Sequence, residues 1–381
     1  MIYFDNSATT KVLPEVLKTY NVVSEEIWGN PSSLHKMGEK SYNLLEQSRK
    51  QIADLMGWQQ DEIYFTSGGT EGDNWIIKGT AIEKRPYGKH IITTSIEHPA
   101  VLNSMQQLEK LGFEVTYLPV DRNGRVIVDD LIASLRNDTI LVSVMAVNNE
   151  VGSIQPLAEI AEILKKYPKV QFHVDAVQGI GKGIQNLLTL DRIDFVTFSG
   201  HKFHAPRGVG FVYKKRGKTI APLLSGGGQE KNLRSSTENL PAIVGMAKAL
   251  RLLLEHETDG IKKQQNIRTK IVEHLQKFEN VEIFSGLDDK FAPHILCFSI
   301  NGVRGETIVH AFEEYDIFIS TTSACSSKKG TVSGTLKSMH IDESIATSAV
   351  RVSLDENNTL QEAEEFMRVF DILYKKFEKL N

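Results

Sequence analysis

The chain has 381 residues, of which 41% are hydrophobic and 24% are charged, and its formal net charge at pH 7 is −4. A chain of this length buries a large core and is expected to form two domains. The small negative charge provides no basic excess, which argues against direct nucleic-acid binding as the main activity.

Two cysteines, Cys297 and Cys325, are too few for a disulfide framework or a cysteine-based zinc cage, and we expect no metal site. Residues 1–5 enter a short strand directly, without the basic and apolar segments of a signal peptide. No apolar run approaches the roughly 20 residues that are needed to cross a bilayer. We therefore expect a cytoplasmic protein without a membrane contact.

Short apolar strands alternate with amphipathic helices from about residue 60 to residue 215. The expected strands are 62–66, 90–94, 113–117, 139–145, 170–174 and 194–198, and the expected helices include one that begins near residue 70 and one over 157–164. Such a pattern is typical of a mostly parallel sheet that helices cover on both faces. Ligands of these sheets bind beyond the carboxyl ends of the strands.

The pattern changes after about residue 240. Long helices are expected over 241–256 and 260–278, followed by strands at 281–284 and 294–300, a helix over 305–314 and a last helix over 360–380. This part indicates a smaller α+β domain.

The segment Ser199-Gly-His-Lys202 follows one predicted strand, and Asp175 follows a neighbouring one. A lysine can condense with an aldehyde, and a carboxylate can keep a pyridine nitrogen protonated. Taken alone, a lysine is usually a solvated cation and an aspartate at a strand end usually caps the next helix. Together they indicate a pyridoxal-phosphate (PLP) site, where Gln178 can donate to a phenolic oxygen.

The glycine turn Thr66-Ser-Gly-Gly-Thr-Glu71 lies between a strand and a helix. Its glycines permit a close approach of the backbone, and free amides at a helix start attract an anion. The alternative is a plain turn with Thr70 as the N-cap. With Ser199 and His201 nearby, a phosphate cradle is the better interpretation.

His98 and Asn149 also follow strands. His98 could stack over a cofactor ring and move protons, although a single histidine is more often structural. Asn149 is compatible with a tight turn, or with a hydrogen bond to the cofactor or to a substrate carboxylate.

The two cysteines have different surroundings. Cys325 lies in a small, polar stretch, whereas Cys297 lies among apolar residues and is expected to be inert packing. A thiol on a polar loop of a cytosolic protein suggests reactivity, and the alternative is an incidental surface cysteine. Arg351 offers a fork suited to a carboxylate, although arginines in strands usually pair at the surface.

These motifs resemble the NifS/IscS-like cysteine desulfurases of the class-V aminotransferase group of PLP enzymes. The resemblance spans nearly the whole chain and rests on the segments 3–10, 29–35, 66–71, 97–98, 148–152, 173–178, 199–202, 226–228, 234–238 and 323–325, and on Arg351. It implies an α/β protein of PLP fold type I that forms a homodimer. It also implies a large domain over 15–255 and a small α+β domain from 1–14 and 256–381, with the catalytic cysteine loop at about 320–335.

The resemblance implies a role for each matching residue. Lys202 would attach the cofactor, Asp175 would pair with the ring nitrogen, Gln178 would face the phenolic oxygen, and His98 would stack on the ring as an acid or base. The implied phosphate ligands are Gly69, Thr70, Ser199 and His201, together with Thr237 of the partner subunit. Asn149, which would also contact the cofactor, and Arg351 would bind the substrate carboxylate.

The implied reaction converts L-cysteine to L-alanine, with the sulfur captured as a persulfide on Cys325 and passed to a protein acceptor. The acceptor would serve tRNA thiolation, iron–sulfur cluster assembly or thio-cofactor synthesis. Because the chain ends soon after its last helix, we expect a tRNA-thiolation enzyme rather than an iron–sulfur scaffold. Ser236 stands where such proteins commonly have glycine, so we expect a different local turn there.

Two alternatives remain open from the sequence. The first is a selenocysteine lyase or another class-V enzyme in which Cys325 is incidental. The second is a PLP-containing scaffold for sulfur carriers that turns over little. The presence of Lys202, His98 and Cys325 together argues against a scaffold, because a scaffold needs none of the three.

Overall fold

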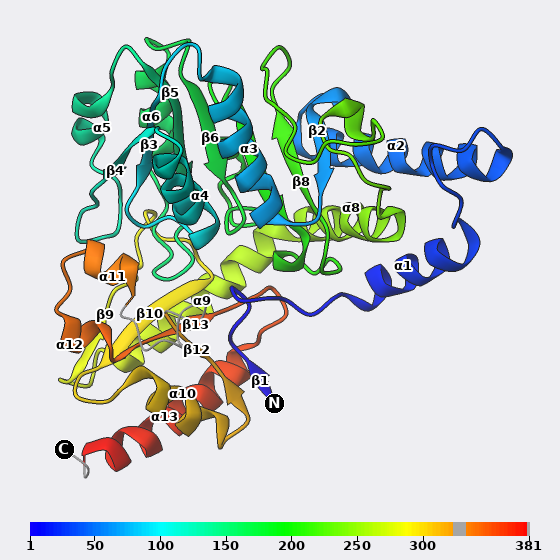
Figure 1. Ribbon diagram of the computed structural model, residues 1–381. Helices are drawn as coiled ribbons and strands as arrows, with labels where there is room; N and C mark the ends of the chain where they lie inside the picture. Colours follow the sequence, from blue (N-terminus) through cyan, green and yellow to red (C-terminus); the bar gives the residue numbers. More distant parts are fainter. Residues whose placement is uncertain (323–332, 379–381) are drawn as a thin grey trace.

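A computed structural model describes residues 1–322 and 333–378 of the chain (Figure 1). Its larger part is built on a seven-stranded sheet with the order β2-β8-β7-β6-β5-β3-β4. The strands are β2 (Ile63–Thr66), β3 (His90–Thr94), β4 (Glu114–Leu118), β5 (Thr139–Met145), β6 (Gln171–Asp175), β7 (Phe195–Ser199) and β8 (Gly210–Lys214).

The central strands of this sheet are parallel, and β8 runs antiparallel to both β2 and β7. The expected mostly parallel sheet is therefore confirmed, with each of the six expected strands within one residue of its place. Strand β8 was not predicted. It follows β7 without an intervening α-helix and pairs with it antiparallel. The prediction was based on strands that alternate with helices, so it missed this strand.

Helices cover the two faces of the sheet. On one face lie α3 (Gly69–Lys84) and α4 (Pro99–Lys110), whose apolar residues pack on β3, β5, β7 and β8. The other face carries the largest core cluster, to which α1 (Pro14–Glu26), α2 (Lys36–Met56), α6 (Leu157–Leu164) and α8 (Leu240–Glu255) contribute. The short helices α5 (Val128–Ser134) and α7 (Gln185–Leu188) complete this part.

Strand β6 shows how the sequence places polar groups inside this layered structure. Phe172 and Val174 point into the largest core cluster. The alternate residues Gln171, His173 and Asp175 point to the opposite face, because successive side chains of a strand alternate. There Gln171 bonds to Thr80 of α3, so a buried polar layer lies between β6 and that helix.

The C-terminal part has a separate core and a second sheet with the order β12-β13-β10-β9. Its strands are antiparallel: β9 (Val281–Ile283), β10 (Ile295–Ile300), β12 (Ser320–Thr321) and β13 (Ala349–Ser353). Its helices are α9 (Glu257–Leu275), α10 (Gly305–Glu313), α11 (Gly334–Ser338), α12 (Glu343–Ala346) and α13 (Leu360–Glu378).

The N-terminus joins this C-terminal part (Figure 1). Strand β1 (Ile2–Tyr3) pairs in parallel with β11 (Ile317–Phe318), and Phe4 is buried in the C-terminal core. The segment that follows therefore has to pass between the two parts of the molecule. The domain boundaries near residues 14 and 255 stay a prediction.

The loop before α8 contains a strained serine. Ser236 has φ 120°, a backbone conformation that L-residues rarely adopt and that glycine adopts without cost. The loop is held by a buried ion pair, because Arg49 of α2 donates two hydrogen bonds of 2.8 and 2.7 Å to Glu230. Next to Ser236, the Ser235 amide donates to the Leu224 carbonyl at 3.0 Å, and the Ser236 amide itself donates to Gln229 Oε1 at 3.2 Å, so the backbone is held in this conformation.

Ser236→Gly should therefore stabilise the protein by about 1 kcal/mol, because it removes this backbone strain. The matched control is Ser225→Gly in the same loop, where the backbone is ordinary. That change should destabilise by about 0.5–1 kcal/mol through the added freedom of the unfolded chain. Urea denaturation measures both free energies of unfolding. An equal loss in the two variants would contradict strain at Ser236.

Candidate active site

A cavity of about 760 Å³ opens at the carboxyl ends of the central strands. Its lining comes from the sheet edge, the N-terminal segment and β13. It includes ten residues that the sequence singled out: Gly69, Thr70, His98, Asn149, Asp175, Gln178, Ser199, His201, Lys202 and Arg351. The structure thus brings these residues together, while their individual roles stay predictions.

Lys202 ends the short 3₁₀-helix η2 (Gly200–Lys202), directly after β7. Its ammonium group donates to the backbone carbonyl oxygens of Ser7 at 2.5 Å and Ala8 at 3.0 Å. These carbonyls belong to the N-terminal segment that passes between the two parts of the molecule. The sequence marked this segment as a motif but did not predict its contact with Lys202.

Asp175 is the last residue of β6, and it is 5% exposed. Burial raises the pKa of this carboxyl to about 6, although a hydrogen bond from the Val177 amide and the charge of Lys202 oppose the rise. A protonated pyridine nitrogen would supply the positive charge that favours the ionised form.

A second acid lies next to Asp175. Asp73 of α3 lines the same cavity and is 1% exposed, and its Oδ1 has no hydrogen-bond partner among the described residues. Burial and the charge of Asp175 both raise the pKa of Asp73. The ring of His173, which burial keeps neutral by lowering its pKa to about 3, lies 3.6 Å from this oxygen. Two buried carboxyls at one end of the cavity favour a cationic or proton-donating ligand.

The glycine turn leaves open backbone at the start of α3. Gly68 is the N-cap residue, with φ 155°, and the first helical residue is Gly69. A side chain at Gly69 would lie 2.7 Å from Val177 Cγ2, so no other residue fits without a shift. The amides of this first turn, with the hydroxyl of Ser199 nearby, form a cradle suited to a phosphate.

Neighbouring groups brace this cradle. Glu71 accepts a hydrogen bond of 2.8 Å from the Ser67 amide and pairs with Arg234 at 2.7 Å. His201 contacts the Thr9 hydroxyl at 3.2 Å. Burial and the charge of Lys202 lower the pKa of His201 to about 4, so its ring is neutral near pH 7 and can donate one hydrogen bond.

His98 is the N-cap of α4, and its Nδ1 accepts a hydrogen bond of 3.1 Å from the Ala100 amide. Burial and the charge of Lys202 lower the pKa of His98 to about 4. The neutral ring therefore carries its proton on Nε2, since Nδ1 serves as an acceptor. In this conformation the Nε2–H of His98 is available as a hydrogen-bond donor.

Gln178 lines the cavity but already has two partners. Its amide nitrogen donates to the Ser7 carbonyl at 2.9 Å, and its oxygen lies 3.3 Å from His294 Nε2. Its predicted contact with a phenolic oxygen would have to be made in addition to these.

Arg351 extends from β13 into the cavity and is 3% exposed. It donates to Asp5 Oδ1 at 2.8 Å and to the backbone carbonyl of Asn149 at 2.8 Å. Its Nε has no partner among the described residues. Asp5, for which no role was predicted, therefore orients the guanidinium in advance, and the guanidinium keeps a free donor for an anion.

Two predicted residues are not part of this cavity as the structure describes it. Thr237 is exposed on the loop before α8, and its predicted role concerns the partner subunit. Cys325 lies outside the described residues, and Thr322 is a cavity residue close to it in sequence. Cys297 is 0% exposed, and burial raises the pKa of its thiol well above the usual range, as expected for inert packing.

Within residues 1–322 and 333–378, no group of three or more histidine, cysteine, aspartate or glutamate side chains is arranged to hold a metal ion. None of the helices in these ranges combines the length and apolar character needed to span a membrane.

Comparisons with known proteins agree with this arrangement. The class-V aminotransferase family profile matches residues 2–366. A NifS/IcsS protein homolog of Lactobacillus delbrueckii subsp. bulgaricus is 58% identical over 381 residues, which cover 100% of this chain and 99% of that protein. The cysteine desulfurase IscS of Methanosarcina thermophila is 40% identical over 380 residues, which cover 100% of this chain and 93% of that protein.

Two solved structures are similar as well. A NifS-like protein has a TM-score of 0.91 at 40% identity and covers 98% of this chain and 99% of that chain. The structure of SspA in complex with cysteine has a TM-score of 0.80 at 32% identity and covers 93% of this chain and 99% of that chain.

A pH-dependent stability is expected from Glu97, the neighbour of His98. Its Oε1 accepts from Thr94 and Met145, its Oε2 has no partner among the described residues, and burial raises its pKa to about 8. Between pH 4.5, the usual pKa of a glutamate, and about pH 8, Glu97 keeps its proton in the folded chain but releases it in the unfolded chain. Stability is therefore lost as the pH rises through this window.

Glu97→Gln should remove this loss, because glutamine has the shape of the protonated acid. Above about pH 8 the variant should be more stable than the wild type by at least about 1 kcal/mol, and the gain should vanish below about pH 5. Urea denaturation of both proteins across this pH range measures the difference in their free energies of unfolding. In the control Glu62→Gln both carboxylate oxygens accept backbone amides, so that variant should only lose stability. A gain that does not depend on pH would contradict the account.

Proposed function

Because the chain belongs to the class-V aminotransferase family, among the NifS- and IscS-like cysteine desulfurases, we propose that it is a PLP-dependent cysteine desulfurase that converts L-cysteine to L-alanine. One observation carries the proposal: Lys202, Asp175 and the open glycine turn before α3 line a single cavity. A similar protein of known structure, SspA, binds cysteine, which supports the choice of substrate.

The cavity fits PLP chemically. Asp175 would hold the protonated ring nitrogen, whose positive charge would favour the ionised form of this buried carboxyl. Gly69, Thr70, Ser199 and His201 would hold the phosphate, joined by Thr237 of the partner subunit in a homodimer. When bound, PLP supplies an electron sink that stabilises negative charge at the α-carbon of an amino acid.

The protein supplies the groups that move protons. Lys202 would attach the cofactor and, once the substrate amine has displaced it, would take the α-proton. The neutral ring of His98 carries its proton on Nε2, where it would donate a hydrogen bond, and it would have to take up a second proton before it could act as an acid. Asn149 and Arg351 would bind the substrate carboxylate, with Asp5 keeping the guanidinium in place.

Cys325 would take the sulfur. Its thiolate attacks the substrate sulfur, so that a sulfur–sulfur bond forms while the carbon–sulfur bond breaks and its electron pair remains on carbon. Protonation of that carbon gives alanine, and Cys325 keeps a persulfide. The attacking species is the thiolate, so a thiol with an ordinary pKa near ~8.5 has to be deprotonated locally.

The persulfide would pass to a protein acceptor in the cytoplasm. The acceptor, which would serve tRNA thiolation, iron–sulfur cluster assembly or thio-cofactor synthesis, needs a thiolate that attacks the terminal sulfur. A new persulfide then forms on the acceptor while the sulfur–sulfur bond to Cys325 breaks and Cys325 leaves as a thiolate.

Cys325→Ala should lower alanine production from cysteine by at least about 100-fold, because the sulfur then has no acceptor in the enzyme. The matched control is Cys297→Ala, which removes the other cysteine and should keep near-normal turnover despite a modest loss of packing. Steady-state alanine and sulfide assays measure both. Full alanine production by the Cys325 variant would contradict the persulfide mechanism.

Arg351→Lys should raise the KM for cysteine by about tenfold, with a smaller change in kcat, because a lysine cannot replace the planar fork of an arginine. Arg368→Lys on the surface of α13 is the control, and its KM should not change. An unchanged KM in the Arg351 variant would exclude that residue as the carboxylate ligand.

A further inference from the structure

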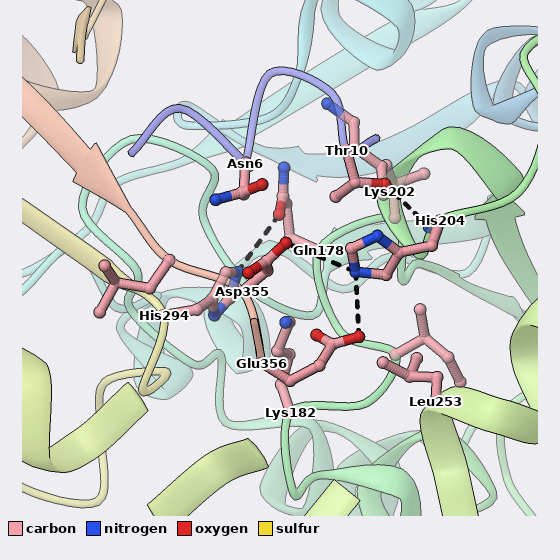
Figure 2. Close-up of a pocket in the computed structure, with 13 residues that line it drawn as sticks. Asn6, Thr10, Gln178, Lys182, Lys202, His204, Leu253, His294, Asp355 and Glu356 are labelled. Atoms are coloured by element: carbon pink, nitrogen blue, oxygen red, sulfur yellow. Dashed lines mark hydrogen bonds and ion pairs between the residues drawn. The ribbon is translucent and has the colours of Figure 1, made fainter. Parts of the chain in front are cut away.

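A second, much smaller polar cavity, of about 10 Å³, is lined in part by Lys202 (Figure 2). A cavity of this size is just large enough for one water molecule. Lys202 and Gln178 line both this cavity and the larger one. The other polar and charged residues that line it are Asn6, Thr10, Lys182, His204, His294, Asp355 and Glu356.

His204 is the central side chain of this cavity. Its Nε2 lies 3.0 Å from Glu356 Oε1 and 3.7 Å from Asp355 Oδ2, while its Nδ1 lies 2.9 Å from the Lys11 carbonyl oxygen. A carboxylate and a carbonyl can only accept hydrogen bonds. Both ring nitrogens must therefore carry a proton, which makes His204 an imidazolium ion.

The charges around His204 agree with this assignment. Burial alone would lower the pKa of His204, but the hydrogen bond and charge of Glu356, with Asp355 and the Lys11 carbonyl, raise it above its ordinary value. The same pair, assisted by Lys182, holds the pKa of Glu356 at about 2 despite burial. The pair is therefore charged near neutral pH.

The backbone of His204 is constrained as well. Its φ is 64°, in the left-handed region that non-glycine residues seldom occupy. Its amide donates to the Thr10 hydroxyl at 2.8 Å, and that hydroxyl donates to the His201 carbonyl at 2.9 Å. A strained residue persists only where its surroundings over-determine it, and such residues cluster at functional sites.

His204 thus ties together three segments that meet at Lys202. Its backbone belongs to the turn that carries Lys202, and Thr10 and Lys11 belong to the N-terminal segment. Glu356 follows β13 in the C-terminal part. The N-terminal segment is also the one whose carbonyls, at Ser7 and Ala8, accept from the Lys202 ammonium.

We propose that His204, paired with Glu356, is a positioning residue for Lys202. The ion pair holds the turn after β7 against the C-terminal part, and His204 binds the N-terminal segment through Thr10 and Lys11. Together these contacts set where the lysine amine lies in the larger cavity. This inference rests on the proposed role of Lys202 in proton transfer, and it assigns His204 no contact with the cofactor or the substrate.

Glu356→Gln tests it without altering the strained backbone. The expected result is a fall in kcat of about tenfold with KM changed less than about threefold, because positioning of the amine affects the chemical step more than binding. In the cofactor-free protein, reductive methylation of Lys202, followed by peptide mass spectrometry, should become about fivefold faster, because the carbonyls hold the amine less tightly.

Asp371→Asn is the matched control, since Asp371 pairs with His274 at 2.7 Å between α13 and α9, away from both cavities. It should change neither kcat nor Lys202 methylation. The proposal is overturned if Glu356→Gln has the same kcat and the same rate of Lys202 methylation as the wild type. It is also overturned if kcat falls equally in Asp371→Asn, because that would indicate a general loss of stability.

His204→Asn provides a second variant, because asparagine tolerates a positive φ. It should reproduce both changes seen in Glu356→Gln. If it fails to fold, the Glu356 variant still decides. The methylation measurement does not depend on desulfurase activity. If the wild-type protein did not act on cysteine, the proposed function would be refuted, but methylation would still test the positioning of Lys202.

Discussion

The Lys202 ammonium has to be held at the boundary between the two parts of the molecule, and two backbone carbonyls of the N-terminal segment hold it there. In the same segment, the Asp5 carboxylate accepts a hydrogen bond from Arg351, and the Ser7 carbonyl accepts one from Gln178. It can do so because β1 and Phe4 are fixed in the C-terminal core. The arrangement of the whole cavity therefore depends on a few residues at the start of the chain.

Burial gives the groups around Lys202 their protonation states. It raises the pKa of the carboxyls Asp73, Glu97 and Asp175, and it lowers the pKa of His98 and His201. A ligand with a positively charged ring and an anionic phosphate complements both ends of such a cavity. His204 differs from the other two histidines, since a buried carboxylate keeps it charged.

Much of the sheet and of the site could be predicted from sequence, because strand ends and glycine turns are local features. Lys202, Asp175 and Gly69 are examples, and all three line the predicted cavity. Contacts between residues far apart in the sequence could not be predicted, among them Asp5 with Arg351 and His204 with Glu356. They depend on tertiary packing, and no local spacing encodes them. The burial of Asp73 is a similar case, since it depends on how α3 lies against β6.

The most direct test of the central claim is the location of sulfur after one turnover. The PLP-loaded protein is mixed with one equivalent of cysteine, quenched, and digested for peptide mass spectrometry while alanine is quantified. The peptide that contains Cys325 should gain the mass of one sulfur atom, with one alanine formed for each sulfur retained. Alanine formed with an unmodified Cys325, or sulfur found on Cys297, would contradict it.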